Sequence, residues 1–335
     1  MKKILVTGAS GFIGSFLTEG ALSRGFDTWA GIRATSNRGY LQDSRLHFID
    51  LPYDNRWKLK EVLTRFKAQN GGWDYIIHNA GLTQSVYCEE FLNVNYQNTR
   101  NFVETLIELE MVPVRFIFMS SLSVFGPVAE KTMQPIRLTD IPAPDTDYGK
   151  SKLKAEEFFA KRTDFPVVTL RPTGVYGPRD KDYFLLTKTV RSGLNVSVGF
   201  KPQRITFIYV KDLVRAVYLA IEKAKPHSSY FVSDGEVYTS SDYALFVQKK
   251  LNVKYLLSLR IPLCMVWLIS ASVGGLMQWM GRSFTLNSDK FKIIKQRNWC
   301  CDNLPIEQDL GFKAEYKLQQ GVDESIDWYL ANGWL

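Results

Sequence analysis

The sequence predicts an α/β protein with a doubly wound parallel sheet and a smaller, mostly helical C-terminal domain. Three observations lead to this prediction. Short runs of β-branched and apolar residues alternate with longer amphipathic stretches through the first half of the chain, which is typical of βαβ units. A glycine-rich turn connects the first such run to the first amphipathic stretch. Beyond residue 178, β-rich runs become rarer. Together these features predict a sheet of the Rossmann type.

The β-rich runs of the first half predict six strands, at residues 4–6, 28–32, 46–49, 75–78, 116–119 and 167–170. The amphipathic stretches between them predict four helices, at residues 12–24, 57–69, 93–110 and 148–162. Further along, we expect one more strand and three helices, at residues 205–210, 212–223, 240–251 and 322–331. We therefore assign a first domain to residues 1–178, which the chain rejoins near 205–224, and a second domain to residues 179–335.

Composition and charge narrow the class of protein. The chain has 335 residues, of which 45% are hydrophobic and 23% are charged, which excludes a disordered, collagen-like or coiled-coil chain. Its length suggests about two domains. The formal net charge is +8. Such a surplus is compatible with nucleic acid, an anionic membrane surface or a phosphorylated ligand, and by itself selects none of them.

The start of the chain and its cysteines point to a reducing compartment. Basic residues at positions 2 and 3 precede a short apolar run, but the glycine-rich turn from Thr7 onward ends that run before it reaches the length of a signal peptide. The four cysteines include no Cys-x-x-Cys pair, and the three histidines are far apart in sequence. We therefore expect a cytoplasmic protein without a disulfide framework or a metal site.

Residues 261–280 contain no charged side chain and form a stretch long enough to span a bilayer. Pro262 near its start and the pair Gly274-Gly275 inside it weaken a spanning helix. We expect an apolar helical lid or wall of a substrate pocket. A segment lying on a membrane surface is the alternative, and a true span is a third.

The turn after the first strand predicts a dinucleotide site. Its glycines, at G-x-x-G-x-x-G spacing rather than G-x-G-x-x-G, allow a sharp turn and let backbone amides approach a pyrophosphate at a helix N-terminus. A tight structural connection is the alternative reading of three glycines. Because the turn lies at a strand-to-helix boundary, we assign cofactor binding to Gly8, Ser10, Gly11, Phe12, Ile13 and Gly14.

The end of the second strand indicates which dinucleotide binds. Arg33 follows this strand, whereas Asp27 lies at its other end. A carboxylate at the tip would bind a free ribose hydroxyl and repel a 2′-phosphate. A guanidinium can instead bind that phosphate in a bidentate pair. Arg33 therefore predicts NADP(H), with NAD(H) as the alternative cofactor. Arg33 could also be a solvent-exposed surface residue with no role in binding.

Tyr148 and Lys152 predict a proton-transfer pair, because residues four apart share one face of a helix. A free tyrosine has a pKa of about 10, and a neighbouring ammonium group would lower it. Such a tyrosine could exchange a proton with a carbonyl or hydroxyl oxygen while hydride moves to or from a nicotinamide. Ser121, at the carboxyl end of the fifth strand, could donate to the same oxygen or simply cap the strand end.

With these motifs in order, the chain resembles the extended short-chain dehydrogenases/reductases, in the NAD(P)-dependent epimerase/dehydratase group. The resemblance covers roughly residues 1–225. It implies that Tyr148 is the catalytic acid or base, that Lys152 holds the nicotinamide ribose and lowers the Tyr148 pKa, and that Ser121 polarises the substrate oxygen. It also implies cofactor contacts by Asp50, Leu51, Asn79, Ala80, Gly81, Asn95, Pro172 and Val175. A homodimer through the helices at 93–110 and 148–162 follows by the same analogy.

Departures from the pattern bear on the subgroup. Gly174 stands where sugar-nucleotide epimerases usually carry Asn, and Leu122-Ser123 stands where sugar dehydratases place Asp-Glu. Residues 25–33 are similar to the NADP-binding strand of dihydroflavonol reductases. The C-terminal Trp299, residues 310–312 and residues 328–334 look like those of 3β-hydroxysteroid dehydrogenase relatives.

The leading hypothesis is therefore an NAD(P)-dependent oxidoreductase that transfers hydride between the nicotinamide and a secondary alcohol or ketone of a largely apolar substrate. The alternative is a nucleotide-sugar epimerase that uses bound NAD without net redox change, with diphosphate contacts from Arg179, Arg191 and Arg204. A non-catalytic dinucleotide sensor is a third class. The expected partner is a small molecule rather than nucleic acid, with peripheral membrane contact through 261–280 as a further expectation.

Overall fold

The computed structural model describes residues 1–85, 87–267 and 288–335. Most of the apolar stretch 261–280, on which the lid and membrane alternatives rest, lies outside the described residues. No helix in the described part of the chain combines the length and apolar character needed to cross a membrane.

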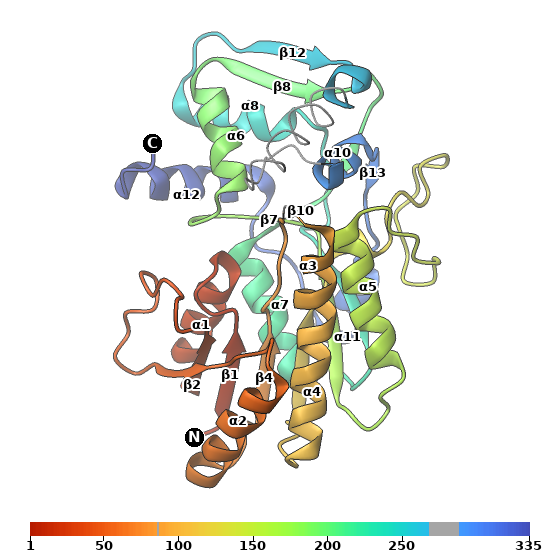
Figure 1. The fold of residues 1–335 in the computed structure, drawn as a ribbon. Coiled ribbons are helices and arrows are strands. Elements are labelled where there is room, and N and C mark those ends of the chain that lie inside the picture. The colour runs from red at the N-terminus through yellow and green to blue at the C-terminus, as the bar shows by residue number, and fades with distance from the viewer. Residues whose placement is uncertain (86, 268–287) are drawn as a thin grey trace.

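A seven-stranded parallel sheet forms the centre of the molecule (Figure 1), in the order β11-β6-β5-β4-β1-β2-β3. The strands are β1 (Lys3–Thr7), β2 (Asp27–Ile32), β3 (His47–Asp50), β4 (Tyr75–His78), β5 (Arg115–Met119), β6 (Val167–Pro172) and β11 (Ser229–Val232). This confirms the predicted fold class. Six of these strands were expected from the sequence, and the seventh, β11, was not.

Helices cover both faces of this sheet. One face packs against α1 (Phe12–Ser23), α7 (Val210–Lys223) and α11 (Leu304–Leu310). The other face packs against α2 (Arg56–Asn70), α4 (Asn98–Glu108) and α5 (Asp147–Ala160).

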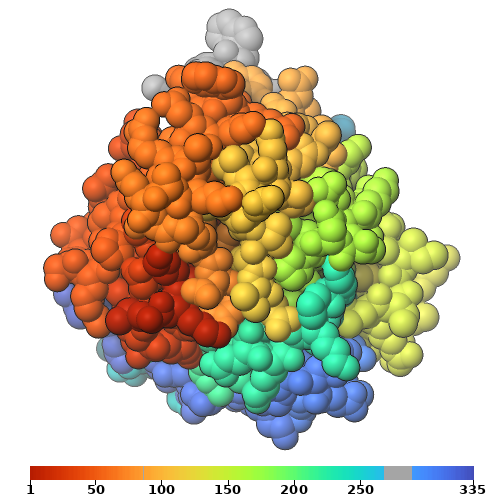
Figure 2. All heavy atoms as spheres, turned by 90° about the horizontal axis from the view of Figure 1, so that it is seen from below, coloured from red at the N-terminus to blue at the C-terminus, as the bar shows by residue number. Residues whose placement is uncertain are grey.

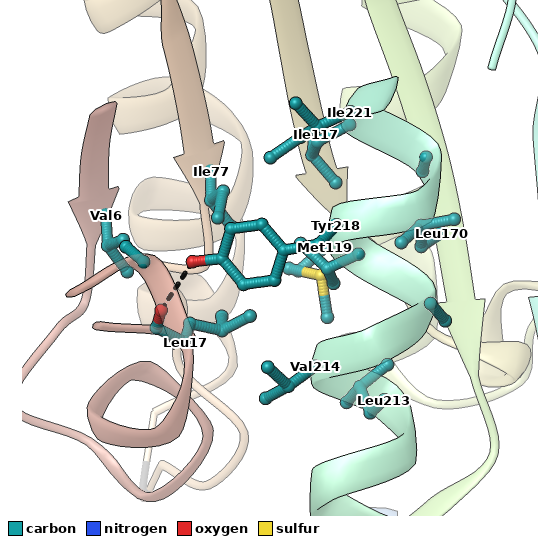
Figure 3. Packing of buried hydrophobic residues seen from close by; sticks show 14 of the residues in the cluster. Val6, Leu17, Ile77, Ile117, Met119, Leu170, Leu213, Val214, Tyr218 and Ile221 are labelled. Carbon is teal, nitrogen blue, oxygen red and sulfur yellow. Dashed lines mark hydrogen bonds between the residues drawn. The ribbon is translucent and has the colours of Figure 1, made fainter. Parts of the chain in front are cut away.

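Figure 3 shows the packing under α7, where the buried Tyr218 ring lies among aliphatic side chains. Its hydroxyl donates to the Leu17 carbonyl oxygen over 2.6 Å. Burial of apolar area stabilises this core, and the hydrogen bond removes the cost of burying the hydroxyl.

The remaining elements form a smaller region beyond the carboxyl ends of the strands (Figure 1). Its strands pair in parallel twos: β7 (Gly174–Tyr176) with β10 (Phe207–Tyr209), β8 (Leu194–Val198) with β12 (Leu257–Ile261), and β9 (Arg204–Ile205) with β13 (Asn298–Trp299). Its helices are α6 (Asp182–Arg191), α8 (Asp242–Leu251), α10 (Ser288–Lys295) and α12 (Leu318–Ala331). The region is thus mixed rather than mostly helical. Strands as short as β7 and β9, of three and two residues, are too short to show a period in the sequence.

The two-stranded sheet β8/β12 lies at the end of the molecule opposite the amino ends of the central strands (Figure 1). Figure 2 views the latter end, where segments from the first half of the chain occupy most of the surface and C-terminal segments lie along one edge. The carboxyl edge of the sheet therefore lies between these two ends.

Candidate active site

The glycine turn between β1 and α1 brings backbone into close contact. Gly8 has a φ of +64°, and a Cβ on it would lie 2.9 Å from the Ala80 Cα atom. A Cβ on Gly14 would lie 2.0 Å from the Gly8 carbonyl oxygen. The N-cap residue of α1, Gly11, provides no side-chain cap, and the first turn contains no acidic residue. The amides around Ser10, Phe12 and Ile13 are therefore suited to an anion such as a pyrophosphate.

The tip of β2 gathers the residues expected around the adenosine. Ile32 pairs with Asp50 on β3, and the Leu51 amide donates to the Ile32 carbonyl oxygen over 3.1 Å. Leu51 is buried, whereas Arg33 and Asp50 are exposed. Within the described ranges the Arg33 guanidinium has no ion-pair partner, so it is available to a charged ligand.

Asn95 lies buried in a π-helical turn (η1, Asn93–Gln97) before α4, a feature that often marks functional sites. Its side chain accepts from the Leu82 amide over 2.7 Å and donates to the Leu82 carbonyl oxygen and to Ser151 Oγ, both over 2.9 Å. A Cβ on Gly81 would lie 3.0 Å from Asn95 Oδ1 and 3.1 Å from Lys152 Nζ. The structure thus brings together Gly81, Asn95 and Lys152, which are far apart in sequence.

His78 is a residue whose part in the site the sequence did not indicate. Its imidazole nitrogens each lie 3.0 Å from a threonine hydroxyl, Nδ1 from Thr7 and Nε2 from Thr99. Thr7 Oγ1 accepts from the Ala80 amide, and Thr99 Oγ1 donates to the Asn95 carbonyl oxygen. Burial, with a smaller effect of the Lys152 charge, lowers the His78 pKa to about 3. A neutral His78 therefore ties β1, the loop after β4 and the π-helical turn together.

Tyr148 and Lys152 lie in α5, which begins at Asp147 and whose N-cap residue Thr146 accepts from the Gly149 amide. The Lys152 ammonium is buried and donates to the Met119 carbonyl oxygen over 2.8 Å. Burial lowers its pKa to about 8, which the charge of Glu156 opposes. Phe91, from α3 (Cys88–Leu92), packs edge-on against the Tyr148 ring.

Burial raises the Tyr148 pKa to about 12, against an opposing hydrogen bond with Ser121. The net shift is therefore upward, whereas the expected effect of Lys152 on this pKa was downward. The Lys152 ammonium is bonded to the Met119 carbonyl oxygen, and loss of water around the phenol dominates. Ser121 itself begins the short 3₁₀ turn η2 (Leu122–Val124), where its hydroxyl accepts from the Ser123 amide.

A largely buried ion pair between Glu156 and Arg171 lies one helical turn beyond Lys152. The Glu156 carboxylate accepts a hydrogen bond from Arg171 Nη2 over 2.7 Å. Its two oxygens also accept from Arg171 Nε, over 3.1 and 3.2 Å. Ser120 donates to the same carboxylate. Arg171 also donates to Ser229 Oγ on β11. These contacts join α5 to β6, to β11 and to the residue that follows β5, and nothing in the sequence indicated the pairing.

The smaller region contacts the start of α5, the helix that carries Tyr148 and Lys152. Asp289, in α10, accepts from the Asp147 and Tyr148 amides over 2.8 and 3.1 Å. A carboxylate at a helix N-terminus is favourable because it meets unpaired amides and the positive end of the helix dipole. The position of Tyr148 thus depends on a residue 141 positions away.

Pro172 ends β6 and Val175 lies in β7, at the same edge of the sheet. Beside them, a Cβ on Gly174 would lie 2.4 Å from the Tyr183 hydroxyl oxygen. The aromatic side chain from α6 therefore fills the space that a larger residue at 174 would need.

The three arginines considered for a diphosphate are placed differently. Arg179 donates to Ser15 Oγ over 2.9 Å and pairs with Glu19 at 2.7 Å. Arg204 donates to the Met133 carbonyl oxygen over 2.6 Å. Arg191 is at the far end of α6, roughly 14 Å along the helix axis from its first residue.

Comparison with known proteins identifies the family. The model of the NAD dependent epimerase/dehydratase family matches residues 4–233. UDP-glucose 4-epimerase of Vibrio cholerae is 30% identical over 253 residues, which cover 70% of this chain and 71% of that protein. The decarboxylating sterol-4-alpha-carboxylate 3-dehydrogenase of Dictyostelium discoideum is 24% identical and covers 97% of this chain and 100% of that protein.

Among solved structures, UDP-glucose 4-epimerase of Thermotoga maritima superposes with a TM-score of 0.79 at 19% identity, over 98% of this chain and 99% of that one. This likeness confirms the fold, and the family match extends over more than half of the chain. The protein is therefore an enzyme of the NAD-dependent epimerase/dehydratase family, the extended short-chain dehydrogenases/reductases, whose cofactor is NAD(P).

Proposed function

We propose that the enzyme is an NADP(H)-preferring oxidoreductase that reduces the ketone of a largely apolar substrate to a secondary alcohol. The observation that carries the substrate class is the engagement of Arg179 and Arg204 in contacts within the protein. The preference for NADP(H) is supported by the exposed Arg33 at the tip of β2.

The residues present suit a dinucleotide. The unobstructed turn at Gly8, Gly11 and Gly14 would hold the pyrophosphate, Arg33 the 2′-phosphate, and Leu51 the adenine. Lys152 would donate to the nicotinamide ribose. When bound, the nicotinamide supplies or accepts the hydride.

Tyr148 is suited to act as the acid in such a reduction. Since its pKa is raised to about 12, the phenol retains its proton at neutral pH. It can therefore donate that proton to a carbonyl oxygen as negative charge develops there. Ser121, which follows β5 at the same edge of the sheet, would orient this oxygen and stabilise the charge.

The polar contacts of the site favour an apolar substrate over a sugar diphosphate. Recognition of a diphosphate usually relies on bidentate arginine contacts, and two of the three candidate arginines already serve α1 and the loop at Met133. Phe91 lies beside Tyr148, and the Tyr183 ring occupies the space next to Gly174. Phe91 is buried and Tyr183 is half-buried, so the packing around this edge of the sheet is aromatic rather than charged.

A second candidate is a nucleotide-sugar epimerase. It is favoured by the 30% identity with the Vibrio cholerae UDP-glucose 4-epimerase. Such an enzyme would oxidise and re-reduce one substrate, with no net consumption of cofactor.

The deciding experiment offers the purified enzyme NADPH or NADH together with long-chain and polycyclic ketones, and separately with UDP-glucose. We expect one molecule of NADPH to be consumed for each alcohol formed, and no conversion of UDP-glucose to its 4-epimer. Epimer formation without added cofactor, together with no reduction of any apolar ketone, would overturn the proposal in favour of the epimerase.

A further inference from the structure

The sheet β8/β12 has one entirely aliphatic face. In its parallel register Leu194 pairs with Leu257, Val196 with Leu259, and Val198 with Ile261. Because side chains alternate between the faces of a strand, all six project to one side. The other face carries Asn195, Ser197, Ser258 and Arg260, with Asn195 donating to Ser258 over 3.3 Å.

The aliphatic face is exposed rather than packed into a core. Leu257 is 59% exposed and Leu259 43% exposed. Val196 is also exposed, whereas Leu194, Val198 and Ile261 are half-buried. Exposed apolar side chains continue beyond both strands, and we call the whole set the apex surface: the six aliphatic residues above together with Tyr255, Phe200, Leu263, Met265 and Trp267. Leu263 lies within 3.8 Å of a Cβ built on Gly199, which places it against the end of β8. Contiguous exposed apolar surface of this kind marks an interaction site.

The chain around the apex surface contains cations but no carboxylates. No Asp or Glu occurs in residues 183–211 or 243–288, the two stretches that contain β8 and β12. Arg191 and Lys201 flank β8, Lys254 precedes β12, and Arg260 lies in it. Across the described part of the chain, none of these four has an ion-pair partner. Uncompensated positive charge therefore surrounds the aliphatic face.

We propose that the apex surface docks the enzyme on a lipid bilayer with anionic headgroups. The aliphatic face would enter the boundary between headgroups and acyl chains, with Tyr255 and Phe200 at that level. Arg191, Lys201 and Lys254, which flank the two strands, would meet lipid phosphates. A second copy of the chain fits less well, because it would bring an equally cationic surface against this one. This proposal rests on the surface alone and does not depend on the substrate of the active site.

The test is co-sedimentation of the full-length enzyme with vesicles of phosphatidylcholine alone and of phosphatidylcholine with phosphatidylglycerol, at low and high salt. We expect binding to the anionic vesicles that weakens as salt rises. The double variant L257E/L259E should bind at least about tenfold more weakly, because it adds two carboxylates to the aliphatic face. K201A/K254A should lose about fivefold per cation on anionic vesicles, with no change on neutral ones.

Ile141→Glu is the matched control, because Ile141 is 84% exposed and lies outside the apex surface; it should bind vesicles as the wild type does. Bound NADPH, measured for every variant, reports that each is folded. The proposal is overturned if the wild type stays in the supernatant with anionic vesicles, or if L257E/L259E binds them unchanged. Conversion of a dimer to a monomer by L257E/L259E, without vesicle binding by the wild type, would instead assign the surface to a second copy.

Discussion

The carboxyl edge of the central sheet buries polar side chains, whereas the apex surface exposes apolar ones. At the sheet edge, buried polar groups such as His78, Asn95 and Glu156 find partners inside the protein. At the apex, aliphatic residues such as Leu257 face outward and the neighbouring cations lack ion-pair partners in the described ranges. The difference separates a site whose polar groups are paired within the protein from a surface whose apolar side chains are largely exposed.

The largest effect is expected at the carboxyl edge of the central sheet, where Tyr148→Phe should lower turnover. Removing the hydroxyl removes the proton donor while leaving the ring in place, so turnover should fall by about 10²–10⁴-fold. Binding of NADPH should stay within about twofold, which fluorescence titration can measure. Turnover equal to that of the wild type would disprove the role of Tyr148.

Glu156→Ala should lower the free energy of unfolding by about 3–5 kcal/mol, because it leaves the Arg171 guanidinium buried without its carboxylate. Urea unfolding measures this loss. The matched control is Glu61→Ala, which removes an exposed pair with Arg65 and should cost less than about 0.5 kcal/mol. Equal losses in both variants would show that the buried pair does not hold the site together.

Lys152 predicts a pH dependence of activity. Its pKa of about 8 means that kcat/KM should fall as pH rises above about 8 and the ammonium loses its proton. Lys152→Arg keeps its charge over this range, so any activity it retains should not show the decline. A wild-type profile that stays flat to pH 10 would contradict this assignment.

The lowered pKa of Lys152 also affects stability, but it makes the free energy of unfolding rise with pH where activity falls. Burial lowers the pKa of Lys152 from 10.5, so between about pH 8 and 10.5 the unfolded chain binds more protons than the folded one. Lys152 should therefore make the free energy of unfolding rise with pH in this window. Comparing urea unfolding of the wild type and Lys152→Met at both ends of the window isolates this contribution.

The smallest effect is expected at the apex. Leu257→Ala should change the free energy of unfolding by less than about 0.5 kcal/mol, since this side chain is 59% exposed. Leu5→Ala, at a fully buried position of β1, should cost about 2–5 kcal/mol. A large loss at Leu257 would mean that the apex surface is packed within the enzyme and is not a docking face.

Sequence reasoning succeeded where the signal is local. The strands of the first half alternate with helices at regular intervals. The glycines from Gly8 to Gly14 lie within seven consecutive residues, so their spacing alone predicts a tight turn. Tyr148 and Lys152 share one helix face, so their proximity follows from spacing.

Long-range features could not be predicted in this way. The contact of Asp289 with the start of α5 and the pairing of Glu156 with Arg171 depend on packing between distant segments. The burial that raises the Tyr148 pKa is a property of the folded site and does not follow from the spacing of Tyr148 and Lys152. The strands β8 and β12 both alternate apolar and polar residues, but their pairing, which creates the aliphatic face, joins segments that are far apart in sequence.

The most direct test of the proposed oxidoreductase is to denature the freshly purified enzyme and identify the nucleotide released per chain. A reductase must exchange its cofactor at every turnover, and Arg33 favours the 2′-phosphate. We therefore predict a substoichiometric amount of nucleotide, consisting of NADP⁺ or NADPH. One equivalent of tightly held NAD⁺ or NADH would contradict the account and identify the enzyme as an epimerase.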